Sequence, residues 1–231
     1  MVYITGDKHG DYDQVFEFCY KNNTSKNDIM IILGDAGINY YLDSKDYTLK
    51  NHLKELPITL FCIHGNHEER PYNIAGYKSK IFNDGIVYYE EKYPNILFAK
   101  DGEVYNFNGV STLVIGGAYS VDKYYRLALG YNWYESEQPN EKIKNDVRKT
   151  LKKYNNKVDL ILSHTCLFKY MPYEVFLENV NQLDVDKSTE EFLDEIENNT
   201  KYQKWYCGHY HTDKQVDKIR FMMNDIEKLK L

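Results

Sequence analysis

The chain contains little of what marks secreted, membrane-bound or multidomain proteins. Only four cysteines and five prolines occur among its 231 residues, and neither a Gly/Ser-rich nor a Pro-rich linker divides it. No apolar run is long enough to cross a bilayer, and the first residues lack the charged and hydrophobic regions of a signal peptide. We therefore expect a single domain over residues 1–231 that is cytoplasmic, not membrane-associated and free of disulfides.

Positive charge is scarce as well. The formal net charge is −6, whereas a surface that binds along a nucleic acid needs clustered Lys and Arg. Extended nucleic-acid binding is therefore not expected, although a local basic pocket is compatible with this balance. Hydrophobic residues make up 42% of the chain, which is enough for one sizeable core in an α/β domain.

Potential metal ligands follow five short apolar runs, at turns that contain or adjoin glycine. They are Asp7 and His9 in TGDKHG, Asp35 in ILGDAG, Asn66 and His67 in HGNHE, His164 in LSH, and His209 and His211 in GHYH. Side chains of an extended segment return to one face every second residue, so Asp7 and His9 can face one object, as can His209 and His211. Such oxygen and nitrogen donors suit manganese, iron, zinc or magnesium. Seven ligands exceed the need of one ion, which favours two ions that share a carboxylate.

The ordered series DxH, GD, GNH[DE], H and GHxH resembles that of the calcineurin-like metallophosphoesterases, and the resemblance extends from residue 3 to residue 211. The resemblance implies two divalent ions, for which we favour manganese over iron, zinc or magnesium. It implies Asp7, His9 and His211 on the first metal, Asn66, His164 and His209 on the second, and Asp35 as the bridge. His67 is then the unliganded histidine beside the leaving group, and we also expect Asn66 to contact the substrate.

These residue types match the chemistry of phosphoester hydrolysis. Two divalent ions roughly 3.5 to 4 Å apart lower the pKa of a bridging water to give a hydroxide nucleophile, and they hold the phosphate oxygens. Neutral imidazole ligands preserve the positive charge that attracts phosphate, and His67 can protonate the leaving oxygen. We expect hydrolysis of a small phosphomonoester or nucleotide. The alternatives are a phosphodiesterase or nuclease of the same fold, or a noncatalytic metal-bound scaffold that binds proteins.

The second motif departs from the phosphoprotein phosphatase branch, whose GDxVDRG is replaced by GDAGIN. Ile38 stands where that branch has the Asp that orients the catalytic histidine, and Asn39 where it has a phosphate-binding Arg. Arg126 is our candidate for the missing phosphate contact, because it lies with Lys123 in a Tyr-rich segment after an apolar run. A surface helix with a buried Tyr-rich face explains this segment equally well, and Arg70 is a second candidate.

Cysteine and the other histidines have simpler interpretations. Three Cys/His pairs two positions apart could suggest a thiolate zinc site: Cys62/His64, His164/Cys166 and Cys207/His209. None has the CxxC spacing of such a site, and we favour core packing for these cysteines. We expect His52 on a solvated helix, and His64 behind the metal ligands.

The periodicity of apolar residues predicts an α/β (α+β) fold. Strands are expected at 2–5, 29–33, 58–63, 96–99, 103–107, 110–116, 159–163, 204–207 and 217–223, and helices at 12–22, 45–55, 139–154 and 188–198. Ser188 and Thr189 ahead of Glu191 suggest a capping box. The first 75 residues predict parallel βαβ units, and turns at Asp101/Gly102 and Asn108/Gly109 predict an antiparallel meander over 96–116. Together they fit two stacked mixed β-sheets flanked by helices, the four-layer αββα sandwich that the resemblance implies.

Overall fold

The computed structural model describes residues 1–178 and 180–230, so positions 179 and 231 of the expected domain lie outside the described residues. The strands are β1 Val2–Thr5, β2 Ile29–Ile32, β3 Thr59–Cys62, β4 Lys78–Phe82, β5 Gly85–Tyr89, β6 Ile96–Ala99, β7 Val104–Phe107, β8 Val110–Ile115, β9 Leu160–Ser163, β10 Lys204–Cys207, β11 Lys214–Val216, β12 Ile219–Phe221 and β13 Glu227–Lys228. The helices are α1 Asp13–Asn22, α2 Ser44–Leu53, α3 Lys123–Leu129, α4 Glu141–Lys153 and α5 Ser188–Asn199. Short 3-10 turns occur at Pro71–Asn73, Glu135–Glu137, Phe168–Tyr170 and Tyr173–Val175.

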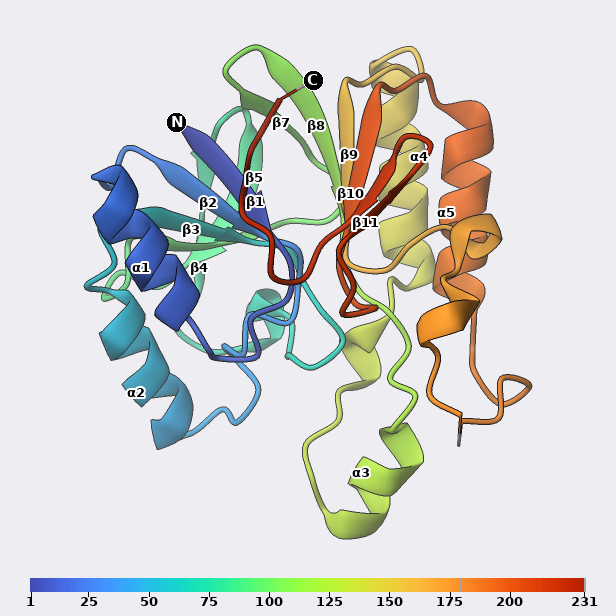
Figure 1. Cartoon of the computed structure of the whole chain (residues 1–231), viewed down its shortest axis with the longest axis horizontal. Coiled ribbons are helices and arrows are strands. Elements are labelled where there is room, and N and C mark those ends of the chain that lie inside the picture. Colours follow the sequence, from blue (N-terminus) through green and yellow to red (C-terminus); the bar gives the residue numbers. More distant parts are fainter. Residues whose placement is uncertain (179, 231) are drawn as a thin grey trace.

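Two mixed sheets pack against each other with helices on their outer faces (Figure 1). The seven-stranded sheet has the order β13-β1-β2-β3-β6-β5-β4, and the six-stranded sheet has the order β11-β12-β10-β9-β8-β7. Helices α1 and α2 cover the first sheet, and α4 and α5 cover the second (Figure 1). The predicted sandwich of two stacked mixed sheets flanked by helices is confirmed.

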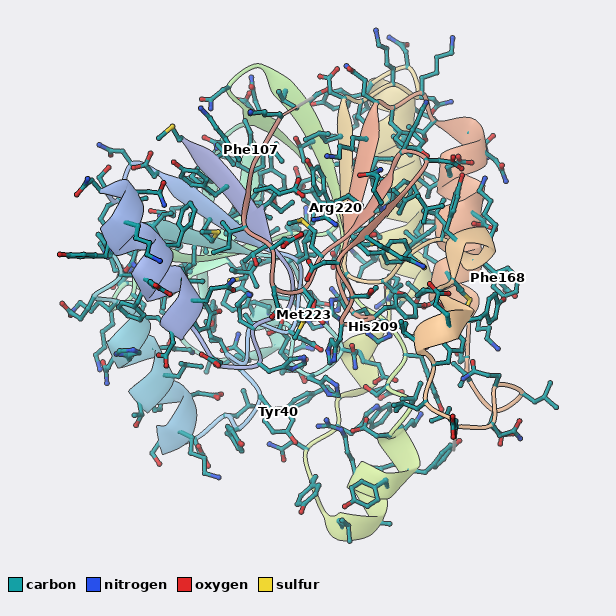
Figure 2. The ribbon with its side chains drawn as sticks, in the orientation of Figure 1. Tyr40, Phe107, Phe168, His209, Arg220 and Met223 are labelled. Carbon is teal, nitrogen blue, oxygen red and sulfur yellow. The ribbon has the colours of Figure 1, made fainter. Side chains whose placement is uncertain are left out.

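Alternating side chains build the layers of the first sheet. Ile4 of β1 and Ile31 of β2 pack between the two sheets, whereas their neighbours Tyr3 and Met30 pack on the outer face with Val15 of α1. Because both faces of these strands are buried, their sequences are apolar without interruption. Phe107 from the second sheet closes the same inter-sheet layer (Figure 2).

The parallel strands end level with one another, which positions the loops that follow them. In the first sheet Ile4 pairs with Ile31, and Ile31 pairs with Phe61. In the second sheet Ile115 pairs with Ser163, and Ser163 with Cys207. The carboxyl ends of strands from both sheets therefore bring their loops to one end of the sandwich.

The meander predicted over 96–116 is wrong in its first half. Strand β6 pairs with β3 and β5 in the first sheet, whereas β7 pairs with β8 in the second. The turn at Asp101/Gly102 thus carries the chain from one sheet to the other. The second turn is correct, because Asn108 and Gly109 both have positive φ angles, 55° and 90°, as a tight hairpin between β7 and β8 requires.

Three other local expectations need correction. The strand predicted at 217–223 is shorter, β12 Ile219–Phe221, because Asp217 takes a φ of 51° at the turn that joins β12 to β11. Helix α5 begins at Ser188 with Lys187 as its N-cap and has no side-chain cap, so the expected capping box does not form. Strands β4, β5, β11 and β13 have no counterpart in the prediction, and helix α3 corresponds to the surface helix that was the alternative for the Tyr-rich segment. None of the helices in the described part of the chain combines the length and apolar character needed to cross a bilayer.

Candidate metal centre

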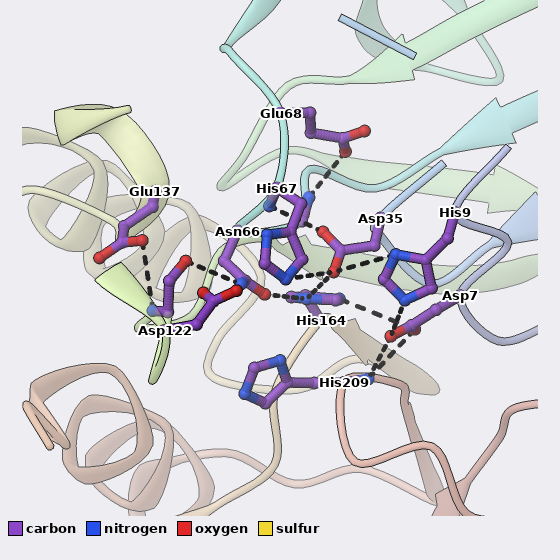
Figure 3. Close-up of polar contacts among 12 residues, drawn as sticks. Asp7, His9, Asp35, Asn66, His67, Glu68, Asp122, Glu137, His164 and His209 are labelled. Carbon is purple, nitrogen blue, oxygen red and sulfur yellow. Dashed lines mark hydrogen bonds and ion pairs between the residues drawn. The ribbon is translucent and has the colours of Figure 1, made fainter. Parts of the chain in front are cut away.

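The eight polar residues that the sequence singles out lie together at the loop end of the sandwich. Those in the loops after β1, β2 and β3 come from the first sheet, and those after β9 and β10 come from the second. Figure 3 shows Asp7 and Asp35 side by side, with His9, His67, His164 and Asn66 around them. The site is therefore built from both sheets.

Asp35 lies at the centre of the cluster. Its Oδ2 lies 4.0 Å from Nδ1 of His9, 3.8 Å from Nε2 of His67 and 3.7 Å from Nε2 of His164, and its Oδ1 accepts the backbone N–H of His67 at 2.9 Å. Burial alone would raise the pKa of Asp35, but electrostatic interactions with His164, His67 and His9 outweigh burial and lower the pKa below its usual range. A carboxylate that stays ionised among imidazoles is suited to share cations.

Asp7 is the second buried carboxylate. The backbone N–H of His209 donates to both of its oxygens, at 3.1 and 3.0 Å. The Nε2 of His211 lies 3.5 Å from Oδ2, and the Nδ1 of His164 lies 3.9 Å from Oδ1. Asp7 thus connects the first motif to the last two.

The glycines of the motifs leave space for ligands from neighbouring loops. A Cβ on Gly34 would lie 2.1 Å from Nδ1 of His164, and one on Gly208 would lie 2.1 Å from Oδ1 of Asp7. A Cβ on Gly65 would lie 2.0 Å from Oδ1 of Asp35. These three glycines are required because a neighbouring candidate ligand occupies the volume that a side chain would need.

The ligand pairs do not have the extended backbone that strand periodicity predicts. Strands β1 and β10 end at Thr5 and Cys207, and His9, His209 and His211 have left-handed backbones with φ of 47°, 66° and 48°. His211 consequently faces Asp7 and His9, whereas the ring of His209 packs on His164 with centroids 5.0 Å apart. The two histidines of GHYH therefore face different neighbours.

The donor atoms fit divalent cations. Two groups of donor atoms lie within 4.8 Å of one another: Asp7, His9 and His211, and Asp7, Asp35 and His164. The Nδ1 of His164 lies 2.7 Å from the carbonyl oxygen of Leu33, so an Nδ1–H donates there and the Nε2 lone pair is left free. That Nε2 lies 2.8 Å from Oδ1 of Asn66. Two acceptor atoms at this distance repel each other, and a cation bound to both would remove the repulsion.

Asn66 and His67 are held by the residues around them. Nδ2 of Asn66 donates to Oγ of Ser120 at 2.9 Å, which leaves Oδ1 directed at His164. The fully buried Glu68 accepts the backbone N–H of Gly65 at 2.8 Å, which explains the acidic residue of the GNHE motif. Among the described residues Nδ1 of His67 has no hydrogen-bond partner.

The positions that depart from the phosphatase branch have structural roles. Ile38 is fully buried in the core beneath α1 and α2. Oδ1 of the buried Asn39 accepts the hydroxyl of Tyr77 at 2.9 Å. Arg70 is buried in an ion pair with Asp101, and its Nε donates to the carbonyl oxygen of Ser136 at 2.8 Å.

Arg126 lies on α3, which projects from the sandwich at the same end as the metal centre (Figure 1). Its Nε donates to Oδ2 of Asp122 at 2.7 Å, and its Nη1 donates to the hydroxyl of Tyr40 at 2.9 Å. The segment forms a surface helix, but its Tyr-rich face is not buried, because Tyr124 and Tyr125 are 69% and 62% exposed. The contact of Arg126 with phosphate stays a prediction.

Cysteines and the remaining histidines agree with their simpler interpretations. All four cysteines are free and buried; Cys62 packs in the core beneath α1 and α2, and Cys166 and Cys207 pack in the core beneath α4 and α5. His52 is exposed and packs on Phe16. His64 is buried and lines a separate cavity of about 270 Å³ together with Arg70.

A cavity of about 440 Å³ adjoins the metal centre. Asp35, Asn66, His67, His209 and His211 line one side of it. Sequence reasoning missed three polar residues at this site: Ser120, Asp122 and Glu190. None stands in a motif, and the sequence around Glu190 indicates only the start of a helix.

The chain is similar in sequence to a known family and in fold to solved structures. A model of the calcineurin-like phosphoesterase family matches residues 1–213. One solved crystal structure has a TM-score of 0.50 and 12% identity, covering 96% of this chain and 88% of that one. A protein of unknown function from Aquifex aeolicus has a TM-score of 0.37 and 13% identity, covering 74% of this chain and 81% of that one. A comparison with curated proteins finds no match. The family model covers most of the chain, and the chain therefore belongs to the calcineurin-like phosphoesterase family.

Proposed function

We propose that this chain is a binuclear metal-dependent phosphoesterase that hydrolyses a small phosphate ester, either a phosphomonoester or a nucleotide. The observation that carries the proposal is the convergence of two buried carboxylates and five imidazoles beside a cavity large enough for such a substrate. Family membership supports phosphoester hydrolysis and metal binding in general, and the finer assignments are ours.

We assign Asp7, His9 and His211 to one metal, Asn66, His164 and His209 to the other, and Asp35 to both. Manganese is our choice of metal, with iron, zinc and magnesium as alternatives. When bound, the two cations activate a water molecule and neutralise phosphate oxygens. Burial lowers the pKa of His209 well below its usual value, so this ring is neutral as a ligand must be.

Asn66 and His67 have proposed roles toward the substrate. Asn66 lies at the cavity wall, where its side chain can also meet a phosphate oxygen. His67 lines the same cavity, with its Nε2 3.8 Å from Oδ2 of Asp35, and we assign it to neither metal. Burial lowers the pKa of His67, which makes its protonated form a stronger acid toward the leaving oxygen.

A second hydrolytic function is a phosphodiesterase or nuclease activity of the same fold, and a noncatalytic scaffold is the alternative outside enzymes. A metal-reconstituted comparison of p-nitrophenyl phosphate with bis(p-nitrophenyl) phosphate separates them. We expect faster turnover of the monoester and loss of turnover in excess chelator. Preference for the diester would establish the first alternative, and no turnover of either ester at full metal content would support the scaffold.

We further propose a small phosphate ester as the binding partner, no extended nucleic-acid binding, and a cytoplasmic location. The acidic net charge and the four buried free thiols support these assignments. A gel-shift titration with duplex and single-stranded oligonucleotides tests the second assignment, for which we expect no shift at moderate salt.

A further inference from the structure

The cavity beside the metal centre has a second side that phosphate chemistry does not explain. Its lining away from the metal ligands comes from four parts of the chain: the segment before α3, the segment between β9 and α5, the first turn of α5, and Tyr210. The lining residues include Val121, Met171, Val175, Phe176, Glu190 and Tyr210. Most of them are apolar, whereas a phosphate group needs polar contacts alone.

The apolar lining includes a stacked aromatic pair. The rings of Phe176 and Tyr210 are nearly parallel, with centroids 6.0 Å apart and an interplanar angle of 7°. Met171 and Tyr119 also line the cavity and are themselves 7% and 8% exposed. Flat aromatic walls of this kind favour a planar ring over a flexible chain, because a ring can stack and loses little conformational entropy on binding.

One carboxyl group interrupts the apolar lining. Glu190, at the start of α5, is 4% exposed and lines the cavity. Its Oε1 accepts the hydroxyl of Thr165 at 2.7 Å, and its Oε2 has no hydrogen-bond partner among the described residues. A buried carboxyl oxygen without a partner is costly, and an aliphatic ligand would leave it unpaired.

We propose that this apolar side of the cavity binds the alcohol part of the ester, and that this part is a planar ring with a hydrogen-bonding edge, as in a nucleoside. The ring lies against the apolar wall that includes Phe176, and its polar edge meets Oε2 of Glu190. The proposal rests on the proposed function for the position of the phosphate, which the metal centre holds. It makes Phe176 and Glu190 residues that determine specificity.

Two variants test the assignment. Glu190→Leu removes the polar contact at similar volume, and Phe176→Ala removes the stacking surface. The matched controls are Glu191→Gln, on the exposed neighbour in the same helix turn, and Leu183→Ala, on a residue that is 93% exposed. Circular dichroism and metal content establish that each variant is folded and loaded before it is assayed.

The first readout compares substrates. We expect Glu190→Leu and Phe176→Ala each to lower kcat/KM for adenosine 5′-monophosphate at least roughly tenfold, since a site built for a hydrogen bond discriminates strongly. The value for glycerol 2-phosphate should change less than about twofold, and both controls should behave as wild type. The proposal would be overturned if folded, metal-loaded variants lost kcat/KM equally on the two substrates. It would also be overturned if the ratio of the two kcat/KM values stayed as in wild type.

The second readout needs no hydrolysis. Calorimetric titration of the full chain with adenosine, with and without metal, should show binding that Phe176→Ala weakens, whereas ribose should not bind. Adenosine binding without turnover of any ester would retain this inference and reject the proposed function. Turnover of glycerol 2-phosphate without adenosine binding would retain the proposed function and reject this inference.

Discussion

The Nε2 atoms of His9 and His211 lie 2.9 Å apart, although 202 positions separate the two residues in the chain. Two imidazole nitrogens at this distance either share one proton or turn their lone pairs to one cation. Oδ2 of Asp7 lies 4.0 Å from Nε2 of His9 and 3.5 Å from Nε2 of His211. Because a carboxylate completes the group, the arrangement favours a cation.

Two metal ions per chain are therefore expected, with both occupancies dependent on Asp35. Asp35→Asn should lose metal at both sites, because a neutral amide cannot hold two cations as a carboxylate does. His211→Ala should weaken only one site. Inductively coupled plasma mass spectrometry measures the content, and Asp13→Asn, on an exposed residue of α1, is the control. At most one ion in active wild-type protein contradicts the binuclear assignment.

His67→Ala should retain wild-type metal content while the rate of hydrolysis falls by roughly 10²- to 10⁴-fold, the range that a general acid supplies. The loss should shrink for nitrophenyl esters, whose leaving groups need little protonation. His52→Ala, outside the metal centre, is the matched control. If losses are equal across leaving groups of widely different pKa, His67 does not donate the proton.

Arg126 connects α3 to the cavity through Asp122. In Arg126→Lys the ammonium group cannot donate to Asp122 and Tyr40 in the same geometry, because it lacks the planar fork of a guanidinium. We expect a clear loss with Lys and a loss in kcat/KM of roughly ten- to hundredfold with Ala, at unchanged metal content. Arg148→Ala is the control, since Arg148 pairs with Glu195 on the outer helices. Wild-type turnover by both Arg126 variants would make it a surface residue without a role in the reaction.

The buried pair of Arg70 and Asp101 should matter for stability. Arg70→Met leaves Asp101 as an uncompensated buried charge, and the free energy of unfolding should fall by about 3 to 5 kcal/mol. Lys78→Met breaks the exposed pair with Glu91 and should cost less than about 1 kcal/mol. Urea denaturation measures both. Similar small effects for the two variants would show that the buried pair is dispensable.

Glu190 should make stability depend on pH. Burial raises the pKa of its carboxyl to about 7. Because this pKa is raised, the contribution of Glu190 to the stability of the folded state is fully present below the unfolded-state pKa of about 4.3. This contribution is lost as the pH rises through about 7. The free energy of unfolding of Glu190→Gln should therefore exceed that of wild type by about 3 kcal/mol at pH 8. Near pH 4 the two free energies should be equal.

Urea denaturation in excess chelator at both pH values measures the Glu190 effect without pH-dependent metal binding. Glu191→Gln, on the exposed neighbour, is the control and should show no such crossover. A constant difference between Glu190→Gln and wild type across this pH range would contradict a raised pKa.

Local sequence signals predicted most elements and the two-sheet architecture, but not which sheet each strand of residues 96–116 joins. The Asn108/Gly109 turn specifies a hairpin by its own backbone preference, whereas the turn at Asp101/Gly102 does not encode which sheet its second strand joins. That choice depends on Asp101, which accepts the backbone N–H of Gly116 at 2.5 Å and pairs with Arg70. Contacts between residues far apart in the sequence leave no periodic signal.

The candidate ligands could be located from short motifs, and their roles stay predictions. Each potential ligand stands in a short motif, and Asp7, His9, Asp35, His164 and His211 bring their donor atoms into two converging groups. Asp122 and Glu190 could not be found in this way, because only the folded chain brings them to the cavity. The periodicity argument placed His209 and His211 on one face, but their left-handed backbones turn the rings to different neighbours.

The glycines that leave space for ligands have a consequence for assembly. His164 from the second sheet occupies the space beside Gly34 of the first, and Asp7 from the first sheet occupies the space beside Gly208 of the second. Neither half of the molecule can therefore complete the proposed ligand set alone, and cations bound there would join the two sheets as well as serve the proposed reaction. Metal affinity should consequently report on how well the sheets are docked, and a substitution far from the ligands that loosens this docking should first appear as lost metal.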